Sequence, residues 1–266
     1  MVEVIELTDP SADAHIARHF GRTPILVQLP TVFAIVAPPT HQGAQLLDRC
    51  KNRLPGKFYS VLIGDLQRFI RLSSGTPLSD YLLQSGGPDR VRTFKNDLCS
   101  TFIRTPVAAK TRSSKMICNG TLQGLILGGI LERKMRWMEE LSASLPDKIL
   151  DTEQGHYCAP IASSCNMSGD PEGSITDFDR ALAFAKSRGV ELVLTNRAAR
   201  DGGSNPIFGI QNDRVETFRE GPGVSKKRHL LEHWLGRALA DSIRFGSLEM
   251  KLSPSVGVPA ASGVGA

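Results

Sequence analysis

The sequence is poor in several features that mark particular classes of protein. Its five cysteines are scattered and include no C-x-x-C pair, which argues against both a disulfide framework and a structural zinc site. No apolar run approaches the length of a membrane span. The first fifteen residues lack the basic start of a secretory signal. We therefore expect a cytoplasmic protein that does not contact a membrane and has no metal-ligating residues of its own.

What the chain does contain is typical of a folded globular protein. It has 266 residues, of which 41% are hydrophobic and 22% charged, so it can bury a large core and is neither disordered nor fibrous. Strand and helix patterns are mixed without regular alternation. This favours an α/β (α+β) fold, a single domain with an open, twisted, mixed sheet flanked by helices.

Local patterns predict most of the elements. Short apolar runs bounded by Pro or Thr are typical of buried strands, and the predicted strands cover 24–29, 32–36, 58–63, 190–194, 207–210 and 215–219. Apolar residues at helical spacing predict helices over 40–50, 121–144, from Ser174 or Thr176 to Arg188, and 225–243. Residues 71–93 are predicted to be loop with at most a short helix. The domain is expected to span 1–245, with an insert-like middle at 71–155 and a disordered tail at 246–266.

Positive charge gathers in one part of the chain. The net charge is +5, and much of the excess lies at Arg90, Arg92, Lys95, Arg104, Lys110, Arg112, Lys115, Arg133, Lys134 and Arg136. Such a segment suits nucleic acid or phosphorylated ligands, or is simply a solvated face. Aromatic residues make up only 6% and do not interleave with these cations, so a platform for stacking single strands is not expected.

Three short motifs match known patterns only weakly. His229–His233 has the H-x-x-E-H spacing of some zinc proteases, but little chain remains for a third ligand. Cys158 and Cys165 follow His156, although cysteine is more often a small core residue than a nucleophile. Gly221–Lys226 lacks the full spacing of a phosphate-binding loop. We assign chemistry to none of them.

Three separated segments carry a more specific signal when they are taken in order. They are Thr31–Ile35 followed by Lys51-Asn52-Arg53, then Ser163–Gly169, then Ile207–Ile210 followed by Phe218–Gly221. Their order, spacing and content resemble the YrdC-like family of threonylcarbamoyl-AMP synthases. The resemblance covers roughly residues 20–70 and 155–225, and it implies a YrdC/RibB-like fold.

The resemblance also implies a reaction, a nucleotidyl transfer that joins L-threonine, bicarbonate and ATP for a tRNA modification. Lys51, Arg53, Ser164 and Asn166 are implied as catalytic residues; Thr31, Ser163, Ser204 and Arg219 as substrate- or nucleotide-binding residues. Cations at the first two positions suit phosphate and carboxylate groups. ATP would act as a substrate with Mg²⁺.

Departures from the family pattern leave two alternatives open. Phe33 and Ala34 replace the tyrosine and glycine of the family's T-V-Y-G-L strand, Asn205-Pro206 replaces its S-T pair, and its P-G-P-x-T segment has no counterpart. One alternative is an enzyme that forms a carbamoyl-adenylate on another amino acid or acceptor. The other is a non-catalytic module that binds nucleotide, tRNA or double-stranded RNA through Arg90, Arg92 or Lys115.

Overall fold

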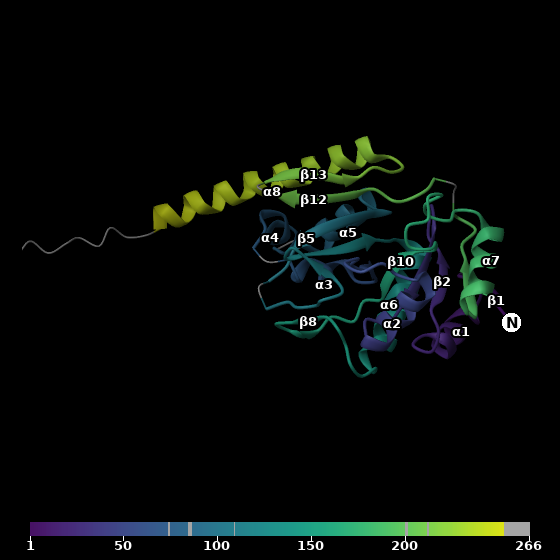
Figure 1. The fold of residues 1–266 in the computed structure, drawn as a ribbon. Coiled ribbons are helices and arrows are strands. Elements are labelled where there is room, and N and C mark those ends of the chain that lie inside the picture. Colours follow the sequence, from purple (N-terminus) through teal and green to yellow (C-terminus); the bar gives the residue numbers. More distant parts are fainter. Residues whose placement is uncertain (74, 85–86, 109, 200–201, 212, 253–266) are drawn as a thin grey trace, which may run out of the picture.

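A mixed sheet organises the molecule, which a computed structural model describes over residues 1–73, 75–84, 87–108, 110–199, 202–211 and 213–252 (Figure 1). The sheet consists of β1 (Glu3–Glu6), β2 (Ile25–Gln28), β3 (Phe33–Ala37), β4 (Ser60–Ile63), β5 (Thr101–Pro106), β6 (Ile117–Cys118), β7 (Thr121–Ile126), β10 (Ile161–Ser164), β11 (Leu192–Thr195), β12 (Ile207–Gln211) and β13 (Arg214–Arg219). Their spatial order is β1-β11-β2-β3-β10-β4-β7-β5-β12-β13, and β6 pairs with β7. A separate small hairpin is formed by β8 (Asp151–Thr152) and β9 (Gly155–His156).

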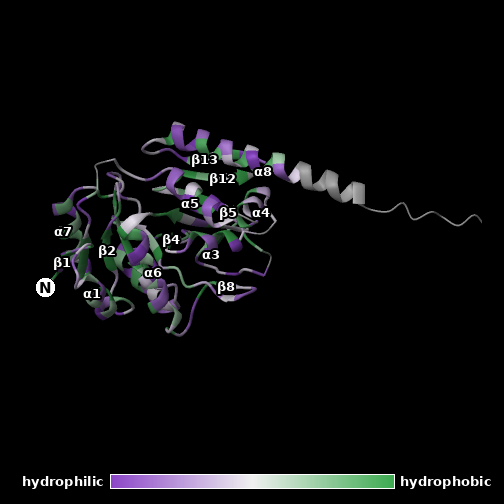
Figure 2. Ribbon diagram, turned by 180° about the vertical axis from the view of Figure 1, so that it is seen from behind, coloured by the Kyte–Doolittle hydropathy of each residue, from purple (hydrophilic) through white to green (hydrophobic). Residues whose placement is uncertain are grey.

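Helices cover both faces of the sheet. They are α1 (Ala12–His19), α2 (His41–Lys51), α3 (Leu66–Arg71), α4 (Pro77–Leu83), α5 (Gly87–Asp97), α6 (Gly129–Ala143), α7 (Phe178–Arg188) and α8 (Val224–Leu252). One face packs against α1 and α6, while the other packs against α2 and the remaining helices. Green colouring follows the central strands in Figure 2, and purple follows the outer side of α8.

The sequence of the central strands explains their position. Phe33 and Ile35 of β3 point into the core beneath α2, whereas Ala34 and Val36 point into the core beneath α1 and α6. All four are buried. A strand with a covered surface on both sides needs apolar residues at successive positions, which is why β3 shows no polar alternation. The predicted open, mixed sheet with flanking helices is confirmed.

The predicted helix over residues 121–144 was wrong in its first third. Residues 121–126 form β7, and α6 begins only at Gly129. A short apolar run fits a buried strand as well as a helix. Two glycines decide between them: Gly128 is the extended N-cap residue of α6, and Gly129 has a positive φ of 61°. That conformation suits glycine and separates the two elements.

The middle of the chain, residues 71–155, is not an appended insert. Its strands β5 and β7 lie within the sheet, between β4 and β12. The predicted loop at 71–93 contains α4 and most of α5. Helix α4 begins with a capping box between Thr76 and Ser79 and has Pro77 in its first turn, which is a start pattern that the composition of this stretch obscured.

Two predicted helix boundaries also change. Helix α8 continues to Leu252, past residue 246 where the tail was expected to begin, and it extends beyond the sheet (Figure 1). Residues 253–266 lie outside the described part of the chain. Helix α7 begins after Asp177, whose side chain accepts a hydrogen bond from the Arg180 amide. It ends at Arg188 as predicted, and Gly189 is its C-cap residue.

Candidate functional site

The end of α2 and the end of β10 meet at a cluster of polar side chains. Thr40 caps the start of α2 by accepting a hydrogen bond from the Gly43 amide at 3.0 Å. Asn52 ends the helix in a left-handed conformation. Lys51 therefore extends from the last turn toward β10, where its Nζ donates to the Ser164 carbonyl oxygen and, at 3.0 Å, to Asn166 Oδ1.

The Lys51 ammonium is buried without a carboxylate partner in its hydrogen bonds. Its acceptors are the Ser164 backbone oxygen, Ser164 Oγ at 3.4 Å and Asn166 Oδ1, all uncharged. The residue is 4% exposed. Burial, reinforced by the positive charge of Arg53, lowers the pKa of this ammonium to about 8. An incoming anion would stabilise its charged form.

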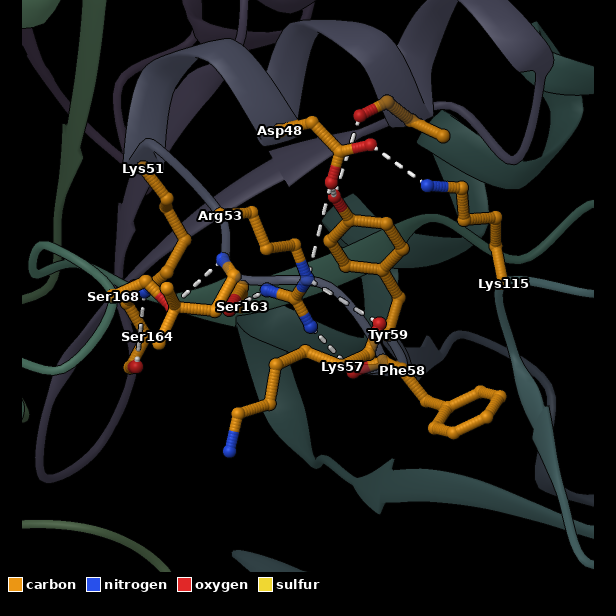
Figure 3. A network of polar contacts seen from close by, with 12 residues as sticks. Asp48, Lys51, Arg53, Lys57, Phe58, Tyr59, Lys115, Ser163, Ser164 and Ser168 are labelled. Atoms are coloured by element: carbon orange, nitrogen blue, oxygen red, sulfur yellow. Dashed lines mark hydrogen bonds and ion pairs between the residues drawn. The ribbon is translucent and has the colours of Figure 1, made fainter.

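Arg53 is held from several sides, as Figure 3 shows. Its Nη1 donates to Ser163 Oγ at 3.0 Å, and its Nη2 donates to the Phe58 carbonyl oxygen at 2.6 Å. Its guanidinium carbon lies 4.1 Å from the centroid of the Tyr59 ring. The stacked ring and the two acceptors fix the plane of the fork, so its remaining N–H groups have a set direction.

A second layer of contacts supports Arg53 from behind. The Tyr59 hydroxyl donates to the Asp48 carboxylate, which also pairs with Lys115 Nζ at 2.9 Å (Figure 3). The Tyr59 amide donates to the Lys115 carbonyl oxygen at 2.8 Å. Burial alone would raise the pKa of the Asp48 carboxyl, but the hydrogen bonds from Tyr59 and Lys115 hold it below its ordinary value.

A cavity of about 190 Å³ opens beside this cluster. The predicted residues that line it are Ser163, Ser164, Ser204 and Arg219. Its polar lining is completed by Ser60, Gln123, Ser174 and Asn205, which the motif analysis did not select. Its apolar floor includes Ala34, Leu62 and Ala162. The site is thus a largely uncharged pocket with a cation at one end.

One corner of the cavity joins segments that lie far apart in the sequence. Thr31 Oγ1 donates to Asn205 Oδ1 at 3.1 Å, and Arg219 donates to the Asn205 carbonyl oxygen through Nε at 3.0 Å and Nη2 at 2.7 Å. Ser174 and Ser204 join their hydroxyls at 2.9 Å nearby. Residues at positions 31, 174, 205 and 219 therefore form one polar corner.

A second hollow of about 250 Å³ adjoins the cavity. The two share Phe58, Ser60 and Gln123. The second hollow adds the cations Lys57 and Arg104. Arg104 Nη2 donates to Gln123 Oε1 at 3.1 Å, so the shared wall is itself hydrogen-bonded. A ligand longer than the first cavity has a cationic extension available.

The structure brings the eight predicted site residues into one region, with two distinctions. Lys51, Arg53 and Asn166 stand behind the cavity wall and hold Ser163 and Ser164, which face into it. Thr31 does not line the cavity; its hydroxyl is used on Asn205 instead. The three segments of the sequence thus predict the region, and the structure separates the supporting residues from the lining residues.

The missed lining residues carried weaker signals. Asn205 precedes β12 at the place where the family pattern has its S-T pair, so the motif itself pointed to the position. Ser60 and Gln123 lie on neighbouring strands and share a 2.6 Å hydrogen bond. Only the pairing of β4 with β7 brings them together, and no spacing rule reveals such a pair. Tyr59 resembled an ordinary strand residue.

The replacement of the family's tyrosine has less effect on the cavity than the sequence suggested. Phe33 is completely buried and packs near Phe178, with 6.4 Å between ring centroids. Its neighbours Val32 and Ala34 line the cavity instead. The change at position 33 therefore lies in the core, and the adjacent residues shape the pocket.

The basic segment is largely neutralised in the structure. Of its ten cations, six form ion pairs with carboxylates: Arg92, Lys95, Lys110, Lys115, Lys134 and Arg136. Arg90 donates to the Tyr81 carbonyl oxygen at 2.8 Å. A surface that attracts nucleic acid needs unbalanced positive charge, and this arrangement offers less of it than the sequence indicated.

Neither a metal cluster nor a membrane span is found in the described ranges. Within them, no group of three or more His, Cys, Asp or Glu side chains is placed to hold a metal ion. His229 and His233 lie exposed on α8. No helix of the described chain is both long and apolar enough to cross a bilayer.

Comparison with known proteins finds similarity at the level of structure alone. No protein-family model matches the sequence, and no curated protein matches it. The chain is similar to P. abyssi Sua5 solved in complex with L-threonine, with a TM-score of 0.58 and 14% identity over 83% of this chain and 57% of that chain. It is also similar to E. coli YciO, with a TM-score of 0.59 and 12% identity over 86% of this chain and 100% of that chain.

A third similar structure is full-length HypF in a phosphate- and nucleotide-bound form. Its TM-score is 0.54, with 15% identity over 79% of this chain and 29% of that chain. The chain thus spans less than two thirds of the length of both P. abyssi Sua5 and HypF. At these identities the comparisons establish a shared architecture. The chain therefore has the YrdC-like fold that its three sequence segments predicted.

Proposed function

We propose that this protein is a YrdC-like nucleotidyltransferase that makes threonylcarbamoyl-AMP from L-threonine, bicarbonate and ATP. The observation that carries the proposal is the convergence of Lys51, Arg53, Ser163, Ser164 and Asn166 at the wall of one polar cavity. P. abyssi Sua5, which shares the fold, has been solved with L-threonine. HypF, which also shares it, has been solved with phosphate and nucleotide.

The chemistry in this proposal balances in two steps. The amino group of threonine combines with bicarbonate to give a carbamate and water. A carbamate oxygen then forms a bond to the α-phosphorus of ATP, and the bond to the β-phosphate breaks, so pyrophosphate leaves. The protein's task is to hold two anions together and stabilise the charge that develops on phosphate oxygens.

The residues of the site suit this task. Ser163 and Ser164 offer short, oriented hydroxyls at the cavity wall, and Arg53 fixes Ser163 through a 3.0 Å hydrogen bond. Lys51 adds a positive charge behind Ser164. The adjoining hollow with Lys57 and Arg104 gives the polyphosphate a cationic extension.

Magnesium in this reaction would enter as part of the substrate. Mg²⁺ prefers oxygen ligands and is commonly bound through substrate phosphates. The lining residues described for the cavity include hydroxyls, amides and a guanidinium but no carboxylate. The site therefore suits Mg²⁺ that is already carried by ATP.

The proposal is tested by measuring pyrophosphate release from ATP, Mg²⁺ and bicarbonate with and without L-threonine. We expect threonine-dependent release by the wild-type chain and a loss of about 100-fold or more in Arg53→Ala and Ser164→Ala, because each removes part of the wall that orients the reactants. Lys186→Ala on the exposed side of α7 is the matched control and should act as wild type. Release that ignores threonine would contradict the proposal.

A second candidate is the same chemistry on another acceptor. It is favoured by Ala34, which lines the cavity at a position where the family pattern has glycine. Under this alternative ATP binds, but pyrophosphate is not released from it in the presence of L-threonine. Another amino acid supports the release. A panel of amino acids in the same assay separates the two candidates.

A further inference from the structure

Asn205 lines the cavity and carries a polar group that the described part of the chain leaves unpaired. The residue is 1% exposed and lines the cavity. Its Oδ1 accepts a hydrogen bond from Thr31 Oγ1 at 3.1 Å. Its Nδ2, by contrast, is buried and has no hydrogen-bond partner among the described residues.

An unpaired buried donor requires an explanation. Leaving one unsatisfied destabilises a folded protein, and native structures contain few of them. Here the residue that carries the donor is well fixed, because two N–H groups of Arg219 donate to the Asn205 carbonyl oxygen at 3.0 and 2.7 Å. The residue is therefore held through its side-chain oxygen and its backbone, while its NH₂ group has no partner among the described residues.

The surroundings specify the chemistry of that ligand. An NH₂ group binds only acceptors. Arg219 contributes positive charge at the same end of the cavity, and the described lining contains no carboxylate that would repel an anion. The fitting partner is an anionic oxygen, on either an amino-acid carboxylate or a nucleotide phosphate.

We propose that Asn205 is a specificity-determining residue whose Nδ2 donates a hydrogen bond to an anionic oxygen of the substrate. Thr31 is its positioning residue, since the hydroxyl of Thr31 binds Oδ1 and so fixes which way the amide is turned. This inference deepens the proposed function and rests on it for the identity of the substrates. It predicts that replacing the Nδ2 donor of residue 205 by an acceptor weakens binding of the substrate.

The test is calorimetric binding of L-threonine and of MgATP, measured separately, to the wild-type chain, Asn205→Asp and Asn205→Leu. We expect both variants to bind one of the two ligands about 10- to 100-fold more weakly, the range for a lost hydrogen bond to a charged group. The ligand that is affected shows whether the oxygen belongs to a carboxylate or to a phosphate. Asn96→Ala, exposed on α5, is the matched control and should bind both ligands as wild type.

Stability measurements distinguish this role from a structural one. Asn205→Leu removes the unpaired donor, which costs little, together with the acceptor of the Thr31 hydroxyl, so it should lower the free energy of unfolding by only about 1 kcal/mol while it loses binding. A variant that unfolds much more easily and binds normally would overturn the inference. So would Asn205→Asp that binds both ligands as wild type, or a wild-type chain that binds neither.

The same variants separate this inference from the proposed function. If the wild-type chain binds a ligand but releases no pyrophosphate, and Asn205→Asp loses that binding, the proposed reaction fails and the role of Asn205 stands. If the wild-type chain and Asn205→Asp release pyrophosphate equally, the reaction stands and the role of Asn205 fails.

Discussion

The buried ammonium of Lys51 should make the stability of the protein depend on pH in one direction. Its pKa of about 8 in the folded chain lies below the ordinary value of 10.5, so the unfolded chain binds this proton more tightly. The charge therefore destabilises the folded state, by about 3 kcal/mol at pH 7 and about 2 kcal/mol at pH 9. Stability from this group rises as the pH rises through that window.

The substitution Lys51→Met isolates the effect. It leaves the Ser164 and Asn166 acceptors without their donor and changes the local packing, but these costs do not depend on pH. The nearby Cys50 thiol, whose pKa burial raises to about 11, is present in both chains, and the charge of Lys51 lowers this pKa less than burial raises it. The free energy of unfolding of wild type minus that of the variant should increase by about 1 kcal/mol from pH 7 to pH 9.

Urea unfolding under reducing conditions at the two pH values measures this difference. Lys186→Met, at an exposed position on α7, is the control and should show the same difference from wild type at both pH values. A Lys51→Met difference that stays constant within about 0.3 kcal/mol, the scatter expected for independent effects, would refute the reasoning. It would mean that the ammonium finds a compensating anion in the folded chain.

Two further substitutions test the support of the site and the packing of the sheet. Tyr59→Phe keeps the ring beneath Arg53 but removes the buried hydroxyl donor. It should destabilise the chain by about 1 kcal/mol. It should also raise the rate at which phenylglyoxal modifies Arg53, which is measured by mass spectrometry. An unchanged rate would show that the stacked ring and the hydrogen bonds to Ser163 and Phe58 hold the guanidinium without the Tyr59 hydroxyl. Gly124→Ala places a Cβ 2.6 Å from the Phe69 ring and should lower stability by about 1–3 kcal/mol in thermal melts, whereas Gly236→Ala, which meets open space within α8, should be neutral or stabilising.

Local sequence patterns predicted an element correctly where its hydrophobic pattern matches only one kind of buried element. Residues 24–36 contain two apolar runs separated by Pro30, and they form β2 and β3 as predicted. The helix predicted for residues 121–126 was wrong because a short apolar run has the same residue types in a buried strand as in a buried helix. The order of the strands could not be derived at all, since β10 pairs with β3 and β4 through contacts distant in sequence.

The candidate site was predictable in its residues more than in their roles. The positions of Lys51 and Arg53 on either side of a helix end indicated cations for a ligand. In the structure Arg53 instead donates to Ser163 in β10, and Lys51 donates to Asn166 just after that strand. Thr31 was expected at the substrate and instead holds Asn205. Such changes depend on which atoms side chains reach after folding, and that geometry is set by the packing of β3, β10 and the loop before β12.

Strand β10 sets the order in which the protein can fold during synthesis. It lies between β3 and β4, which precede it in the chain. The edges of these two apolar strands that face β10 therefore stay unpaired until residue 164 has left the ribosome. Unpaired apolar edges invite association with other chains. The polar corner is completed only when Arg219 emerges. The nascent chain should therefore depend on protection by holding chaperones for most of its synthesis, and ligands can recognise it only near the end.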